Sequence, residues 1–368
     1  MKICRVTQAL YPYVVGGSPI HCHELSNFQS SKGHKVTVLT PKRETKIENC
    51  KIKYKLKQFF WYKMPWDFLG MENPFSPKLW YSLLKEDFDI LHAHSHLFFT
   101  TFFSVIIAKM KKKPAIVTIH GVRAVRDTAT NFFQEIWLNL FSRYIFKIAD
   151  KIICLTNEDA KEIKKYGAGD KDIIVLSNGI DTDLFKPSDK NNNSVLWIGR
   201  FVEEKGLKYL VDASVDLIDK HKDIEFVLVG DGPLKDQIKN LTKELNLFDH
   251  FMFLDFVPQS NIAELMKSCG VFVLPSLQEG FPKSILEAMA CAKPIITTNG
   301  LAEIVQDCGI IVEEENSKEL TKAIDILITN SSERIKRGKV GRKYVKDRWS
   351  WDILEEKIAD VYESVLRF

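Results

Sequence analysis

Residues Val271–Thr297 read VFVLPSLQEGFPKSILEAMACAKPIIT, and this one stretch contains a strand pattern, a turn, a helix pattern and a second strand pattern. The apolar runs at its two ends have the length of buried strands. Gly280 and Pro282 mark the turn, and Ser284–Ala292 has the composition and spacing of a helix. This order predicts one βαβ unit of a parallel sheet.

Two carboxylates flank the start of the predicted helix. Glu279 lies in the turn, and Glu287 lies within the helix. A turn that leads into a helix presents unsatisfied N–H groups and the positive end of a dipole, which suits a phosphate. A carboxylate on either side would bind hydroxyl groups, so the layout fits a sugar, a diphosphate and a nucleoside. The alternative is a surface glutamate beside a partly exposed helical one.

The same alternation of apolar runs and helix patterns extends over all 368 residues. The strands predicted in the first half are Lys2–Val6, Lys35–Leu39, Ile90–His92, Ala115–Ile119, Lys151–Leu155 and Ile173–Leu176. Those predicted in the second half are Val195–Ile198, Glu225–Val229, Met252–Leu254, Val271–Leu274, Pro294–Thr297 and Ile310–Val312. Helix patterns separate them, so the sequence predicts an α/β fold with two similar doubly wound parallel sheets.

A polar stretch, Asp181–Asn193, lies between the two halves. It contains Pro187 and ends in three asparagines, which is typical of a linker. The predicted domains are therefore residues 1–180 and residues 194–346, joined by residues 181–193. Residues 347–368 follow with one last helix pattern, Trp351–Leu366.

The composition is that of a globular protein, with a net charge of +4 and a pI of about 8.5. This mild excess of positive charge does not indicate a nucleic-acid partner. The seven cysteines form no C-x-x-C pair, which favours reduced thiols and a cytoplasmic location. The start of the chain is too short for a signal peptide, and no apolar run is long enough to span a membrane.

A basic stretch in the first half alternates strictly between lysine and apolar residues: Lys51–Lys57 reads KIKYKLK. One interpretation is an edge strand protected against aggregation. The other is contact with an anionic membrane or a phosphorylated acceptor, because Phe59, Phe60, Trp61 and Trp66 follow it. Under the second interpretation, the protein would bind peripherally to the cytoplasmic face of the membrane.

Histidines gather near the ends of two predicted strands. His92, His94 and His96 alternate, so they are expected on one face, lining the crevice at the carboxyl edge of the sheet. No cysteine or carboxylate completes a ligand set, so no metal site is predicted. His120 ends another strand and precedes Gly121, where it would reach a sugar hydroxyl. A strand-end histidine with a structural role is the alternative.

Three loops in the two halves have ligand-binding chemistry. Gly16 and Gly17 precede the first helix, but they do not form the G-x-G-x-x-G fingerprint of a nicotinamide cofactor. Arg200 and Lys205, in the segment GRFVEEKG, would neutralise a diphosphate. The backbone at Val257 follows another strand and would pair with the edge of a base.

Together these pieces resemble glycosyltransferase family 4. The matching segments are YPYVVGGSPIHCHEL, SKGHKVTVLT, DILHAHS, TIHG, SNGID, GRFVEEKG, VGDGPL and SLQEGFPKSILEAMACAKPII, in the family's order. The resemblance implies the GT-B fold, two facing Rossmann-like domains with a deep cleft between them, and a final helix that crosses back to the N-terminal domain. One departure is the segment Asn299–Glu303, where the family often has two glycines and a proline before a glutamate.

The resemblance also implies roles for single residues. Arg200 and Lys205 would bind the donor diphosphate, Glu279 the sugar hydroxyls, and Glu287 the ribose hydroxyls. His120 would contact the sugar near its anomeric carbon. The catalytic residues implied are therefore His120, Glu279, Arg200 and Lys205. The other donor contacts implied are Gly16, Gly17, Val257, Phe281, Pro282, Lys283, Ser284, Ile285 and Glu287.

The function expected is transfer of a hexose or N-acetylhexosamine from a nucleotide sugar, and the resemblance implies retention of the anomeric configuration, with no cofactor and no essential metal. Uridine is favoured as the donor base, and guanosine remains open. The acceptor would be a lipid-linked glycan, another glycan or a small polyol. A nucleotide-sugar epimerase or hydrolase, and a non-catalytic nucleotide-sugar-binding protein, are the alternatives.

Overall fold

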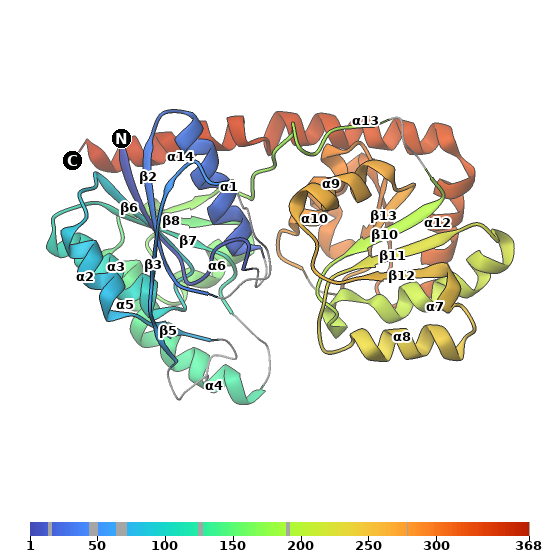
Figure 1. Cartoon of the computed structure of the whole chain (residues 1–368), viewed down its shortest axis with the longest axis horizontal. Coiled ribbons are helices and arrows are strands. Elements are labelled where there is room, and N and C mark those ends of the chain that lie inside the picture. The colour runs from blue at the N-terminus through green and yellow to red at the C-terminus, as the bar shows by residue number, and fades with distance from the viewer. Residues whose placement is uncertain are drawn as a thin grey trace. The chain divides into compact units, whose positions relative to one another are not determined.

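The computed structural model of the chain describes residues 1–13, 17–43, 51–63, 72–123, 128–188, 192–277 and 279–367. It divides into two compact units. The first unit contains Met1–Gly179 together with Trp351–Phe368, and the second contains Ile180–Ser350 (Figure 1). Among the described residues, no helix has both the length and the apolar composition needed to cross a membrane.

The first unit is built on a seven-stranded parallel sheet in the order β3-β2-β1-β6-β7-β8-β9. Its strands are β1 (Lys2–Val6), β2 (Lys35–Pro41), β3 (Lys55–Phe59), β6 (Ile90–His94), β7 (Ala115–Ile119), β8 (Lys151–Cys154) and β9 (Ile173–Val175). A small antiparallel pair, β4 (Tyr62–Lys63) and β5 (Pro74–Phe75), stands apart from this sheet. The strand order changes direction between β1 and β6, which makes that point the switch point of the sheet.

Helices cover both faces of this sheet (Figure 1). They are α1 (Ser18–Ser31), α2 (Pro77–Lys85), α3 (Phe99–Met110), α4 (Thr128–Trp137), the π-helix η1 (Leu138–Ser142), α5 (Arg143–Ile148), α6 (Asn157–Lys164) and α14 (Trp351–Leu366). Ile3 and Ile90 belong to a core shared with α1 and α14. Their neighbours in the strands, Cys4 and Leu91, belong to a second core shared with α2, α3, α5 and α6. This period-two alternation buries both faces of the sheet.

The second unit contains a six-stranded parallel sheet in the order β12-β11-β10-β13-β14-β15. Its strands are β10 (Ser194–Ile198), β11 (Glu225–Val229), β12 (Phe251–Leu254), β13 (Val271–Leu274), β14 (Ile295–Thr298) and β15 (Gly309–Val312). Its α-helices are α7 (Leu207–Lys220), α8 (Lys235–Glu244), α9 (Gln259–Ser268), α10 (Lys283–Ala290), α11 (Ala302–Val305), α12 (Ser317–Thr329) and α13 (Ser331–Arg348). The βαβ unit predicted from Val271–Thr297 is confirmed as β13, α10 and β14.

The segment predicted as a linker packs on the second unit where it is described. Phe185 is fully buried in that unit's core. The Arg342 guanidinium of α13 donates hydrogen bonds to the carbonyl oxygens of Thr182 and Phe185, at 3.0 and 2.7 Å. An apolar side chain in the core and two backbone acceptors held by one guanidinium explain why the described part of this polar stretch packs on the second unit.

The basic stretch of the first unit is an edge strand. Strand β3 starts at Lys55, later than predicted, and lies at the end of the sheet, paired with β2. Tyr54 is buried and Leu56 half-buried, while Lys53 and Lys55 are exposed. The edge-strand interpretation is therefore confirmed, and Trp66 lies outside the described residues.

Candidate functional site

The second unit has its switch point between β10 and β13. The chain runs from β10 to β11 and β12 on one side of the sheet, and returns to β13 on the other side. Ligands of doubly wound sheets bind outside the strand carboxyl ends at such a point, because the loops diverge there. Arg200 follows β10 at this edge and is exposed, and Glu279 follows β13.

Two glycines allow the loops at this edge to pack closely. Gly206 has φ +63°, and a Cβ atom there would lie 2.0 Å from the carbonyl oxygen of Pro275, in the loop after β13. Gly230 has φ +139°, and its Cβ would lie 1.9 Å from the carbonyl oxygen of Gly199. Side chains at these positions are excluded by both contact and backbone conformation. The glycines therefore fix how the loops after β10, β11 and β13 meet.

Lys205 and Glu279 form an ion pair at this point, although 74 positions separate them in the chain. Their side chains are only 15% and 13% exposed. The Ser276 hydroxyl also donates to Glu279 Oε1 at 3.4 Å, and the backbone N–H of Leu277 donates to the Glu204 carbonyl at 2.9 Å. The structure thus brings together a cation and a carboxylate that the sequence assigned to one ligand.

Glu287 is the more buried of the two predicted carboxylates, with its side chain 6% exposed. It forms an ion pair with Lys283, one turn earlier in α10, at 3.4 Å. Gln259, the first residue of α9, donates its side-chain N–H to Glu287 Oε1 at 3.2 Å. The sequence analysis names Val257 but not Gln259 as a site residue. The signal that could have indicated Gln259 is its position directly after Pro258, at the start of a helix.

The start of α10 presents backbone donors at the same edge. Pro282 precedes the helix, and among the described residues no side chain caps it. The N–H groups of Lys283, Ser284 and Ile285 belong to its first turn, which has no intrahelical acceptors. Phe281 lies just before, half-buried, with its ring 5.8 Å from that of Trp349. Val257 is half-buried in the loop after β12.

This edge therefore combines two kinds of chemistry. Arg200, Lys205 and the first turn of α10 offer positive charge and N–H donors, which match phosphate oxygens. Glu279 and Glu287 offer acceptors, which match sugar hydroxyls. None of these groups is a nucleophile paired with a base, so the arrangement suits binding of a charged leaving group rather than covalent catalysis by a side chain.

The switch point of the first unit collects histidines. His94 ends β6, His120 follows β7, and His21 lies on α1. His94 Nδ1 lies 3.1 Å from His120 Nε2, and the ring centroids of His21 and His120 are 5.1 Å apart. Burial lowers the pKa of His94 and His120, so both are neutral at physiological pH. His21 was not among the predicted site residues, because its helix gave no sign that it faces the sheet edge.

The expectation that His92, His94 and His96 share one face is wrong for His96. His92 and His94 stack, with ring centroids 4.5 Å apart, and His92 Nδ1 lies 2.6 Å from the Tyr362 hydroxyl. Ser95 has φ +64°, which ends the strand alternation. His96 consequently packs against Phe146, on the other face of the sheet, with its ring centroid 5.2 Å away.

Three histidines at the switch point of the first unit are candidates for holding a metal. Among the described residues, one group of ligand atoms converges: His21, His94 and His120 each place a ring nitrogen within 4.8 Å of the others. The expectation that the protein needs no metal remains a prediction.

The predicted glycine pair before α1 is described only in part. Gly17 is exposed and has φ −77°, a backbone conformation that any residue can adopt, and Gly16 lies outside the described residues.

Comparison with known proteins adds to this geometry. Residues 15–184 match the model of Glycosyltransferase Family 4, and residues 181–344 match that of Glycosyl transferases group 1. The chain is similar to an uncharacterized glycosyltransferase, MJ1178, of Methanocaldococcus jannaschii, with 31% identity over 293 residues that cover 76% of this chain and 77% of the relative. The chain belongs to the family 4 glycosyltransferases.

This glycosyltransferase is also similar to a bacterial enzyme and to a solved structure. The UDP-Gal:alpha-D-GlcNAc-diphosphoundecaprenol alpha-1,3-galactosyltransferase of Escherichia coli is 33% identical over 241 residues, 60% of either chain. The structure of Anabaena Alr3699/HepE, in complex with UDP and glucose, superposes with a TM-score of 0.78 at 18% identity, over 99% of this chain and 100% of that one. The protein is therefore a glycosyltransferase with the GT-B fold.

Proposed function

We propose that this glycosyltransferase transfers a hexose or N-acetylhexosamine from a UDP-sugar to an acceptor, with retention of the anomeric configuration. The observation that carries the proposal is the placement of Arg200, the Lys205–Glu279 pair and the start of α10 at one switch point. In a nucleotide sugar, the sugar hydroxyls would bind the carboxylate acceptor, and the diphosphate next to the sugar would bind the cations and the N–H donors.

Departure of the nucleoside diphosphate would be the step that these groups accelerate. Negative charge grows on the leaving phosphate as the bond to the sugar breaks. Arg200, Lys205 and the N–H groups of the first turn of α10 would stabilise that charge more in the transition state than in the ground state. The leaving phosphate would accept the acceptor's proton on the same face, which is the course proposed for retention. Fixed cations make a metal unnecessary in this scheme.

The nucleoside would lie on the α9 side of the site. Glu287 would accept hydrogen bonds from the ribose hydroxyls, with Gln259 orienting its carboxylate. The backbone at Val257 would meet the base. Uridine is the base proposed, and the likeness to the UDP-bound Anabaena protein supports it. The assignment of His120, Gly16 and Gly17 to the donor sugar and phosphates stays a prediction.

For the acceptor we propose a lipid-linked glycan. The E. coli relative is named for a diphosphoundecaprenol-linked acceptor, which supports this class. Another glycan or a small polyol is the alternative. A cytoplasmic location, as expected from the composition, is part of the proposal.

Donor turnover is the direct test. The purified protein is incubated with UDP-sugars and GDP-sugars, each with and without an undecaprenyl-diphosphate glycan, and nucleotide release is followed. The proposal expects release that depends on both a UDP-sugar and the acceptor, with an α-linked product from an α-linked donor. Equal release without acceptor would favour the epimerase or hydrolase, and binding without release would favour a non-catalytic binder.

A further inference from the structure

A continuous helical run in the first unit has an unusually apolar outer face. It comprises α4, η1 and α5, from Thr128 to Ile148. Its inner face is buried in the core through residues such as Trp137, Leu138 and Phe146. Its outer face repeats at helical spacing and consists of Phe132 (65% exposed), Phe133 (45%), Ile136 (41%), Leu140 (62%) and Tyr144 (47%). Outer faces of helices are normally polar, so this exposed apolar face indicates a docking surface.

Two neighbouring helices extend this apolar face. On α3, Met110 is 71% exposed; on α2, Tyr81 and Leu84 are 59% and 45% exposed. Aromatic contacts connect the three helices. The rings of Phe102 on α3 and Tyr144 on α5 are 6.1 Å apart, and those of Trp80 on α2 and Phe103 on α3 are 4.4 Å apart. In Figure 1, α2, α3 and α5 lie side by side on the face of the sheet opposite α1 and α14.

The charges on these helices are almost all positive. Their cationic residues are Lys78, Lys85, Lys109, Arg143 and Lys147, and Glu135 is their one acidic residue. Of these cations, Arg143 and Lys147 continue the outer face of the helical run, and both are exposed. An apolar face beside cations is complementary to an anionic lipid surface.

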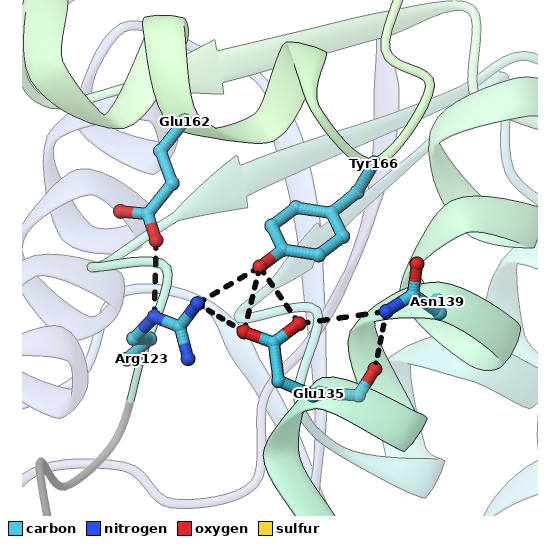
Figure 2. A network of polar contacts seen from close by, with 5 residues as sticks. All are labelled: Arg123, Glu135, Asn139, Glu162 and Tyr166. Atoms are coloured by element: carbon cyan, nitrogen blue, oxygen red, sulfur yellow. Dashed lines mark hydrogen bonds and ion pairs between the residues drawn. The ribbon is translucent and has the colours of Figure 1, made fainter. Parts of the chain in front are cut away.

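The one acid is neutralised within the unit. The Arg123 guanidinium forms an ion pair with Glu135 and donates from Nε to Glu162 at 3.0 Å (Figure 2). The Tyr166 hydroxyl donates to Glu135 at 3.1 Å, and Asn139 donates to its second oxygen at 3.4 Å. Desolvation of Glu135 opposes ionisation, but the hydrogen bonds from Arg123 and Tyr166 outweigh it and lower the pKa of this carboxyl. The acid therefore stays charged and paired, and it does not repel an anionic partner.

We infer that the outer face of α2, α3 and the α4–α5 run, here called the apolar face, docks on an anionic lipid bilayer. This inference rests on the proposed function, since it would bring the transferase to a lipid-linked acceptor. A second copy of the chain fits less well, because a symmetric contact through the apolar face would bring Arg143 and Lys147 of both copies together. A bilayer instead supplies opposite charge and an apolar interior.

Flotation of the full-length protein with vesicles tests the inference. The probes are vesicles of phosphatidylcholine alone and vesicles that also contain phosphatidylglycerol. We expect binding only to the anionic vesicles, weakened by high salt. Replacing both cations (Arg143→Ala with Lys147→Ala) should weaken binding about thirtyfold. Replacing two apolar residues (Phe132→Ser with Leu140→Ser) should weaken it by at least about tenfold even at low salt.

Matched controls come from the second unit. Ile326 and Ile335 are 49% and 56% exposed there, so Ile326→Ser with Ile335→Ser should leave vesicle binding unchanged. Equal loss in this control, binding to neutral vesicles alone, or no binding by the wild-type chain would overturn the inference. So would a wild-type dimer, detected by light scattering, that the Phe132→Ser, Leu140→Ser variant converts to a monomer without any binding to vesicles.

UDP binding, measured by calorimetry without vesicles, separates this inference from the proposed function. Binding of UDP without binding of vesicles removes only the docking surface. Binding of vesicles without binding of UDP removes the nucleotide-sugar site and leaves the apolar face as a lipid-binding surface. All variants should bind UDP as the wild type does, because none of the substituted residues is among the groups that form the candidate site.

Discussion

At the scale of single residues, the ion pair between Lys205 and Glu279 is the most informative feature of the site. Both side chains are largely buried, and each is assigned to a different part of one ligand. Burial strengthens the interaction of each with whatever charge lies beside it. Removing the Glu279 carboxylate therefore also changes the charge that Lys205 presents to a bound diphosphate.

Replacing Arg200 should weaken binding of the nucleotide. The Arg200→Ala change removes an exposed guanidinium assigned to the diphosphate, and a charge-assisted hydrogen bond contributes roughly 1.5–3 kcal/mol. We expect the Kd for UDP to rise about tenfold to a hundredfold, measured by titration calorimetry. Lys208→Ala, which removes an exposed cation on α7, is the control and should leave the Kd unchanged. Unaltered affinity in the Arg200 variant would contradict the site assignment.

Replacing Glu279 should affect turnover more than affinity for UDP. The Glu279→Ala change removes an acceptor assigned to the donor sugar, while Lys205 loses the carboxylate that neutralises it. We expect kcat to fall at least about a hundredfold, with UDP bound as tightly as before or more tightly. Steady-state kinetics and calorimetry on the same preparation separate the two effects. Weaker UDP binding with normal kcat would assign Glu279 to the nucleotide instead.

At the scale of elements, the loops after β10 and β13 depend on the absence of a side chain at Gly206. A Cβ atom would meet a backbone carbonyl at 2.0 Å, and the φ of +63° adds strain. We expect Gly206→Ala to destabilise the second unit by at least about 2 kcal/mol. Gly300→Ala is the control, since nothing lies within 4 Å of its Cβ. Urea unfolding followed by circular dichroism measures both, and equal stability of the two variants would contradict the packing argument.

Several elements could be predicted from the sequence because their patterns are local. The βαβ unit around α10 and the helix Trp351–Leu366 follow from apolar spacing and turn residues alone. The π-helix η1 was not predicted, because its hydrogen-bond shift depends on packing in the core. The alternation in Lys51–Lys57 predicts a strand from Lys51, but β3 starts at Lys55, where its described pairing with β2 begins.

At the scale of the whole molecule, the two units should respond differently to acid. Burial lowers the pKa of His92 and His94 well below the ordinary value, and that of His96 to about 3. In the unfolded chain each of these imidazoles binds a proton near pH 6.5, whereas in the folded first unit it stays neutral at that pH. Its stability is therefore full above about pH 6.5 and falls as the pH drops, by about 1.4 kcal/mol per pH unit for each histidine.

Unfolding by urea at about pH 7 and about pH 5 checks this expectation. The transition of the first unit should move to lower urea at the lower pH. A His96→Leu variant should show a shallower pH dependence, because it removes one group that must stay neutral. A steeper or unchanged dependence in that variant would show that His96 is not one of the groups responsible.

The positions of two histidines could not be predicted from the sequence. The pattern His92, His94, His96 predicts one shared face, but the positive φ of Ser95 sends His96 into the opposite core. His21 is not among the site residues predicted from the sequence, yet it joins His94 and His120 because α1 packs across the switch point of the sheet. The spacing of residues along the chain predicts neither the backbone conformation of a single residue nor the packing between distant elements.

The α/β class, the two-sheet organisation and the family could be predicted from the amino-acid sequence, because strand length, helix spacing and short loop motifs are local properties. Three features required the folded structure: the contact of Lys205 with Glu279, the hydrogen bond from Gln259 to Glu287, and the apolar face over α2, α3 and the α4–α5 run. These facts depend on which loops converge at a sheet edge and on which helix faces remain uncovered. Both are settled by long-range packing of the folded chain.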